Sequence, residues 1–233
     1  MRHIAAIAGV VGVLCSLVAV SPAMALGVAD LSSKDTSSGI REVLVKGAEA
    51  AVGQLGKPNG FMGDARVRIP LPDSLQQAEG MLRKFGMGKQ ADELIETMNR
   101  AAELAVVEAK PILVNAVRTM SFDDAKAILT GGENAATEYF RRTTSAPIGE
   151  KFLPVVKKAT AKVQLADKYN QYAGKAAKFG LIDAKDANLD SYVTQKALDG
   201  LYLMIAEKEK AVRSDPIGSG SALLKKVFGA VGN

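Results

Sequence analysis

The stretch that decides the fold is Leu198-Asp199-Gly200-Leu201-Tyr202-Leu203-Met204-Ile205, in a chain of 233 residues. Its apolar side chains would cover nearly the whole circumference of a helix. This pattern predicts a helix over residues 189–212 that is apolar on nearly every side along its middle. We therefore expect this helix to be central and buried.

Most of the remaining chain also shows helical spacing, interrupted by glycine and proline. Apolar residues recurring three and four apart predict further helices, with glycines or capping residues at their ends. Their ranges are 40–55, 74–85, 89–110, 121–131, 133–142, 165–179 and 221–231. Pro111 either kinks the third of these or starts a fresh helix reaching residue 119. The segment up to residue 163 contains Pro147 and Pro154 and is either one kinked helix or two short ones.

One segment, residues 61–72, has a different pattern. Val67, Ile69 and Leu71 alternate with polar or proline positions, which predicts an extended chain. Its two prolines exclude a central sheet strand. The segment is either a strap whose apolar side chains plug the core, or an edge that pairs with a partner or an anionic surface. Asp73 and Gln76 then suggest a capping box at the next helix. The fold class is thus all-α, a single compact domain of about eight helices with one short, Pro-flanked extended segment.

The amino-terminal 25 residues have the three parts of a secretory signal. A basic end at Arg2 precedes an apolar run over residues 4–20, and Ala23 and Ala25 supply the small-x-small ending. We expect cleavage after Ala25. A retained membrane anchor and lipidation at Cys15 are the alternatives, and both fit the residues less well. The expected organisation is a signal peptide over 1–25, a flexible leader over 26–36 and a helical domain over 37–233.

Removal of this signal would restrict the available chemistry. The chain has one His and one Cys, His3 and Cys15, and no Trp, so the processed chain would have none of the three. This excludes a Ser-His-Asp triad, a cysteine nucleophile, an internal disulfide and zinc or iron sites that need His or Cys. We expect no cofactor and no metal.

The charge balance is mildly basic. The chain carries a net charge of +5, which becomes +4 without Arg2. Basic residues occur as scattered pairs such as Lys157-Lys158 and Lys225-Lys226, and we expect them to be evenly spread. No basic stripe with interleaved aromatic residues is evident, so nucleic acid is not an expected partner.

Several motifs, taken in order, resemble one bacterial family. They are Arg68-Ile69-Pro70-Leu71-Pro72, Met98-Asn99-Arg100-Ala101-Ala102-Glu103, Ile128-Leu129-Thr130-Gly131-Gly132, Ala136-Thr137-Glu138-Tyr139-Phe140-Arg141-Arg142-Thr143-Thr144, Asp186-Ala187-Asn188-Leu189-Asp190 and Lys196-Ala197-Leu198-Asp199-Gly200-Leu201. The family is catalogued as domain of unknown function 4197, and the resemblance covers roughly residues 30–230. It implies an exported helical protein located in the periplasm of Gram-negative bacteria. It implies no reaction, cofactor or catalytic residue.

The first candidate site is a polar strip on the helix predicted over 89–110. Glu96, Asn99, Arg100 and Glu103 lie at i, i+3, i+4 and i+7 and therefore share one face. The strip is either a cleft for a polar ligand or an arginine bridged to two glutamates that fixes the helix in place. A di-iron site of the helical-bundle kind would also need histidine.

The second candidate is a glycine pair before a helix. Thr130, Gly131 and Gly132 precede the helix that carries Thr137, Arg141 and Arg142. Exposed backbone N–H groups at such a start suit an anion. The alternative is a tight corner between two helices, with one cap following another.

Two further segments are candidate binding elements, and each has a structural alternative. Asp186, Asn188 and Asp190 resemble the start of a calcium loop, but the later ligand positions fail, so a helix cap at Asn188 or Asp190 is the alternative. The segment 221–231 is amphipathic and would either lie on a membrane or pack on the domain.

These observations favour an exported, non-enzymatic helical protein that binds a partner or a small anionic or amphiphilic ligand. Peripheral membrane contact is a variant of this hypothesis, and the oligomeric state is open. The alternative hypothesis is a hydrolase or transferase that uses carboxylates alone, with Glu96, Glu103 and Glu138 as its candidate catalytic residues. Two of those carboxylates in one pocket would favour this alternative.

Overall fold

The computed structural model describes residues 33–86, 88–178 and 187–215, which form eight helices and no strand. The helices are α1 (Ser33–Leu55), α2 (Asp73–Lys84), α3 (Gly88–Val106), α4 (Ala109–Thr119), α5 (Phe122–Thr130), α6 (Ala135–Thr160), α7 (Gln164–Lys178) and α8 (Leu189–Ser214). The predicted all-α domain with about eight helices is confirmed. The expected signal over 1–25 and the expected helix over 221–231 lie outside the described residues.

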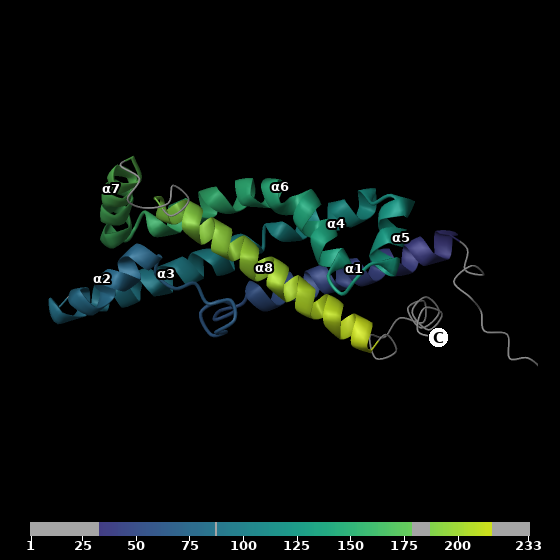
Figure 1. Cartoon of the computed structure of the whole chain (residues 1–233), viewed down its shortest axis with the longest axis horizontal. Coiled ribbons are helices and arrows are strands. Elements are labelled where there is room, and N and C mark those ends of the chain that lie inside the picture. Colours follow the sequence, from purple (N-terminus) through teal and green to yellow (C-terminus); the bar gives the residue numbers. More distant parts are fainter. Residues whose placement is uncertain (1–32, 87, 179–186, 216–233) are drawn as a thin grey trace, which may run out of the picture.

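The central helix is α8, as its sequence predicts. It crosses the long axis of the molecule diagonally and packs against α1, α3 and α6 (Figure 1). Of the six apolar side chains in its deciding stretch, only Leu203 is at the surface, 40% exposed. Gly200 allows Phe61 to approach α8, because a Cβ at this position would lie 2.7 Å from the buried Phe61 ring.

The two prolines do not break α6, which runs unbroken through Pro147 and Pro154. The prediction of a separate helix over 133–142 is therefore wrong. A stripe of side chains four residues apart is buried along the whole helix and packs it against α3 and α8. The stripe consists of Phe140, Thr144, Ile148, Phe152, Val156 and Thr160.

Two other local predictions also need correction. The helix expected over 89–110 ends at Val106, and α4 starts at Ala109, two residues before Pro111.

The capping box predicted at Asp73 and Gln76 does not form. Asp73 is already helical, and the Gln76 amide instead donates to the Leu71 carbonyl at 2.6 Å. A capping box does form at α5.

The segment before α2 is a strap over the core. Turns occupy most of residues 61–67, and the extended chain covers only residues 68–72, which is shorter than predicted. Val67, Ile69 and Leu71 are buried, while Arg66 and Arg68 face outward, as their alternation predicts. The name strap is used below for the whole connection between α1 and α2, residues 56–72.

The described domain is elongated (Figure 1). The α2–α3 hairpin and α7 form one end, and α5 with the start of α1 forms the other. Within the described residues, no helix combines the length and apolar character needed to cross a membrane.

Candidate functional site

The polar strip of α3 holds the strap. Asn99 is completely buried, and its amide makes a matched pair of hydrogen bonds with Ile69. The Ile69 N–H donates to Oδ1 at 2.8 Å, and Nδ2 donates to the Ile69 carbonyl at 2.9 Å. Nδ2 also contacts the Ile95 carbonyl at 2.8 Å. A single side chain thereby satisfies both backbone groups of a buried residue outside any helix.

Glu103 acts on the other end of the strap. It is 4% exposed, and its Oε1 accepts the backbone N–H groups of Phe61 and Met62 at 3.1 and 3.2 Å. Its Oε2 accepts from Arg100 at 2.8 Å, which raises the pKa of the Arg100 guanidinium. Arg100 also donates to the Asn59 side chain at 2.9 Å. The buried oxygens of the strip are therefore already hydrogen-bonded within the chain.

Glu96 is the exception, because it points outward. Its side chain is 61% exposed and lies 3.7 Å from Arg100. Of the two interpretations of the strip, the geometry supports an arginine bridged to two glutamates that fixes the strap in place.

A pH effect on stability follows from the outer face of the strap. Arg66 bonds Asp64 at 2.8 Å and Glu207 of α8 at 2.7 Å, and its hydrogen bonds lower the pKa of Asp64 from 3.8 to about 2. The pair therefore stabilises the fold above about pH 4, and this contribution is lost as the pH falls towards about 2. We expect urea midpoints of the wild type and Asp64→Asn to differ near neutrality and to converge over that acid range. A constant difference would contradict this.

The start of α6 does bind an anionic group, but that group is a carboxylate of the same chain. The Glu209 carboxylate of α8 is 6% exposed and accepts the N–H groups of Ala136 and Thr137 at 3.0 and 2.9 Å. It also accepts the Thr137 hydroxyl at 2.8 Å and pairs with Arg213 at 2.8 Å. Glu209 therefore caps α6 from another helix and complements its dipole.

The glycine pair before α6 forms a helix–helix corner. A Cβ on Gly131 would lie 2.6 Å from the Ala127 carbonyl oxygen and 2.7 Å from the Ala135 Cβ. Thr130 closes α5 by donating its hydroxyl to the Lys126 carbonyl at 2.9 Å. Gly132 joins this corner to α6 through the bond from the Ala135 N–H to its carbonyl, at 3.1 Å.

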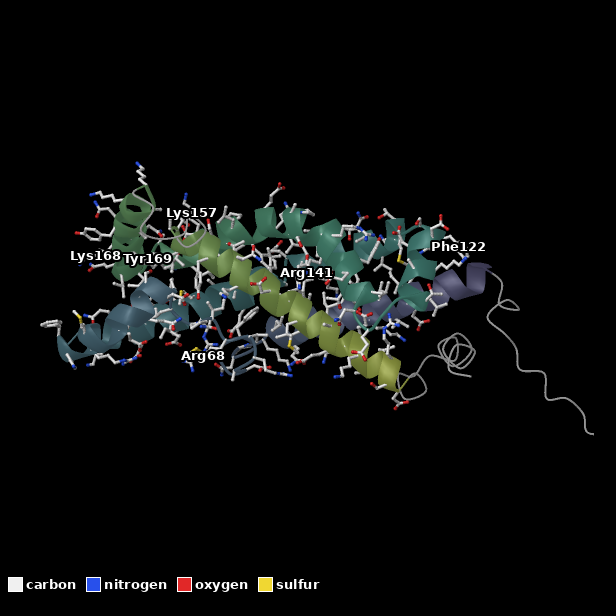
Figure 2. The ribbon with its side chains drawn as sticks, viewed as in Figure 1. Arg68, Phe122, Arg141, Lys157, Lys168 and Tyr169 are labelled. Carbon is white, nitrogen blue, oxygen red and sulfur yellow. The ribbon has the colours of Figure 1, made fainter. Side chains whose placement is uncertain are left out.

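The two arginines of the second candidate do not converge on this corner. Arg141 stacks over the Tyr202 ring of α8, with 4.8 Å from its guanidinium carbon to the ring centroid (Figure 2). Arg142 lies 3.3 Å from Asp124 of α5. These residues therefore link α6 to its neighbours and form no common anion cradle.

The carboxylates proposed for acid–base chemistry do not share a pocket. Glu103 is buried against the strap, Glu96 is exposed, and Glu138 is 67% exposed beside Arg141. Among the described residues, no three His, Cys, Asp or Glu side chains lie together to hold a metal ion. Asn188 caps α8 by accepting the Ser191 N–H at 3.0 Å, and Asp190 accepts the Thr160 hydroxyl. The geometry supports the cap at Asn188, and Asp186 of the calcium-like motif lies outside the described residues.

A groove between four helices has the features of a binding site. α1, α5, α6 and α8 enclose a groove, open to solvent, whose walls are almost entirely apolar, with a cavity volume of about 50 Å³. Side chains of all four helices line it, including Ile40, Leu44, Leu129, Phe140, Ile205 and Val212. Concave apolar surface is a feature of sites for apolar ligands, but this groove is much smaller than the roughly 300–1,000 Å³ pockets that bury a drug-sized ligand.

One cation lies at the groove with spare hydrogen-bonding capacity. Lys208 lines it and donates to the neutral Gln54 side chain at 2.9 Å. An ammonium has three donors, and within the described part of the chain no carboxylate pairs with this one. Arg213 and Glu209 also line the groove, but they are engaged with each other.

The comparisons with known proteins identify the family. The family model described as "Protein of unknown function (DUF4197)" matches residues 30–229. The chain belongs to this family. No curated protein and no solved structure matches the DUF4197 chain.

Sequence reasoning missed the groove of this DUF4197 protein and the role of Glu209. Glu209 and Arg213 are four residues apart in α8, a spacing that indicates a helix-surface pair but not a tertiary cap. The groove combines side chains of four helices, so no local pattern could have revealed it. Lys208 carried no signal either, because its neighbour Gln54 lies 154 residues away.

Proposed function

We propose that this DUF4197 protein is an exported, non-enzymatic binding protein that takes a small anionic amphiphile in the groove between α1, α5, α6 and α8. The observation that carries the proposal is the apolar groove with Lys208 at its edge. An alkyl chain would lie against Leu44, Phe140 and Ile205. A carboxylate or phosphate head would pair with the Lys208 ammonium, a charge-assisted contact.

The other polar clusters support this choice by elimination. The buried oxygens of Asn99, Glu103 and Glu209 are already bonded to backbone groups of the same chain. A ligand that displaced them would leave buried N–H groups without partners, which costs about 1–3 kcal/mol for each group. Binding in the groove would break no such hydrogen bond, because a ligand there covers apolar surface.

The size of the groove sets the class of ligand. The volume of the groove, about 50 Å³, is a third of the roughly 150 Å³ cavity that accommodates benzene, so the groove holds only a few methylene groups. The remainder of an alkyl chain would lie along the open side. This favours a slender, flexible tail over a rigid ring system.

A negative charge placed in the groove should strongly weaken the binding of an anionic amphiphile. We expect calorimetric titration with dodecanoate to show binding by the wild type and at least about tenfold weaker binding by Val212→Glu, since a carboxylate would be buried against the tail. Val107→Glu is the matched control, because Val107 is 51% exposed and lies outside the groove. Equal affinities of the two variants would contradict the proposal.

A second variant separates the head from the tail. Lys208→Met should weaken dodecanoate but leave a neutral dodecyl ligand nearly unaffected, because only the charge-assisted contact is lost. Equal losses for both ligands would show that Lys208 only shapes the groove.

A further inference from the structure

The last turns of α6 and the whole of α7 carry the positive charge of this chain. Residues 151–178 contain seven lysines and one aspartate, whereas the entire chain has a net charge of only +5. The lysines are at 151, 157, 158, 162, 168, 175 and 178. The expectation of evenly spread charge is therefore wrong for this region, and the rest of the chain is close to neutral.

These lysines face solvent, and all seven are exposed. Other lysines form ion pairs, such as Lys46 with Glu42 and Lys110 with Glu49, but among the described residues these seven lysines form none. Lys157 and Lys168 lie at the α7 end of the molecule, near Tyr169 (Figure 2). The described carboxylates therefore make no direct ion pair with these lysines.

Apolar side chains are exposed at the same end. Tyr172 is 67% exposed, and it borders a shallow, mainly apolar groove between α7 and the start of α2. Leu75 and Ala173 line this groove together with Lys168. At the end of α2, Met81 and Phe85 are 60% and 78% exposed. Exposed aromatic and aliphatic groups framed by lysines are typical of surfaces that enter the interface of a membrane.

We propose that this end of the molecule, formed by α7 and the last turns of α6, docks on an anionic phospholipid surface. Lysines near such a surface gain electrostatic attraction, and tyrosine is favoured at the boundary between headgroups and acyl chains. The alternative anionic partner, nucleic acid, fits less well. Residues 151–178 contain no arginine, the side chain that forms bidentate contacts with phosphates and bases.

The absence of tryptophan from the chain allows a site-specific test. Tyr172→Trp places a single fluorophore at the proposed surface, and Phe122→Trp places one at the opposite end, on a side chain that is 47% exposed (Figure 2). We expect vesicles of phosphatidylglycerol and phosphatidylcholine to shift the emission of Tyr172→Trp to the blue and to leave Phe122→Trp unchanged. Added salt should reverse the shift, because the attraction is electrostatic.

Charge reversal then tests the lysines. In the Tyr172→Trp background, Lys157→Glu with Lys158→Glu should weaken vesicle binding at least about tenfold, since four units of charge change at the surface. Arg118→Glu with Lys126→Glu makes the same charge change at exposed positions on α4 and α5 and should have little effect. Circular dichroism of all variants monitors folding.

Any of the following results would overturn the proposal. They are no shift of Tyr172→Trp, an equal shift at both ends, an equal shift with phosphatidylcholine alone, and equal losses from the two charge reversals. Tighter binding to a DNA duplex than to anionic vesicles would also overturn it, in favour of a nucleic-acid surface.

Discussion

Asn99→Ala should be among the most destabilising single substitutions in this protein. It removes both hydrogen bonds to Ile69 and leaves a buried N–H and a buried carbonyl without partners. At about 1–3 kcal/mol for each stranded group, we expect a loss of about 3 kcal/mol of unfolding free energy. For a chain of this size, that corresponds to a fall in Tm of about 6–12 °C.

Two companion variants identify the cause. Asn99→Asp retains an acceptor for the Ile69 N–H but cannot donate to the carbonyls of Ile69 and Ile95, so it should also be strongly destabilising. Glu96→Ala, on the same strip but 61% exposed, should leave Tm nearly unchanged. If Asn99→Ala and Glu96→Ala melted alike, the strap would not depend on this amide.

The loosened strap should be visible by proteolysis. Trypsin can cleave after Arg66 and Arg68, both exposed, only when the backbone leaves the core positions of Val67 and Ile69. We expect Asn99→Ala to be cleaved there faster than the wild type, because local opening costs less free energy.

Glu209→Ala should have an effect of similar size. It removes the acceptor of two backbone N–H groups and one hydroxyl at the start of α6, and it leaves Arg213 without its carboxylate. Breaking a largely buried pair from one side costs about 3–5 kcal/mol, so denaturant midpoints should fall accordingly. The double variant Glu209→Ala/Arg213→Ala should lose less than the sum of the two single losses, because no unpaired cation remains.

Added anions offer a sharper test of the Glu209 cap. In Glu209→Ala the N–H groups of Ala136 and Thr137 become available, so acetate or sulfate should raise Tm more than chloride at equal ionic strength. The wild type should show a smaller preference, which reports only the general exclusion of such anions from protein surfaces, since its own carboxylate fills the position. An equal preference in the two proteins would contradict the cap.

The sequence was sufficient for the helical fold class, for most of the helices and for much of the strap. Most of the circumference of α8 is apolar and buried, and the alternation from Val67 to Leu71 reports burial directly, so both predictions are confirmed. The continuity of α6 was predictable too, since the side chains that prove buried, Phe140, Thr144, Ile148, Phe152 and Val156, recur every four residues across both prolines. Local proline rules obscured that pattern, because packing against α3 and α8 outweighs the hydrogen bonds that proline removes.

The candidate sites show the limit of such reasoning. Glu103 and the start of α6 have the chemistry expected of sites, but their partners are Phe61 and Glu209, which lie 42 and more than 70 residues away along the chain. A sequence pattern cannot distinguish a ligand from a distant part of the same protein. The lysine-rich region 151–178 was visible in the sequence, but its exposure and lack of ion pairs become evident only in the fold.

Hydrogen exchange of the full chain with and without dodecanoate tests most directly the claim that the groove binds while the polar clusters hold the fold. We expect slower exchange on ligand addition in segments of α1 and α8 that contain Leu44 and Ile205. Exchange in the strap and around Asn99 should stay unchanged. Protection confined to the strap and the α3 strip, or no protection at the groove, would contradict it.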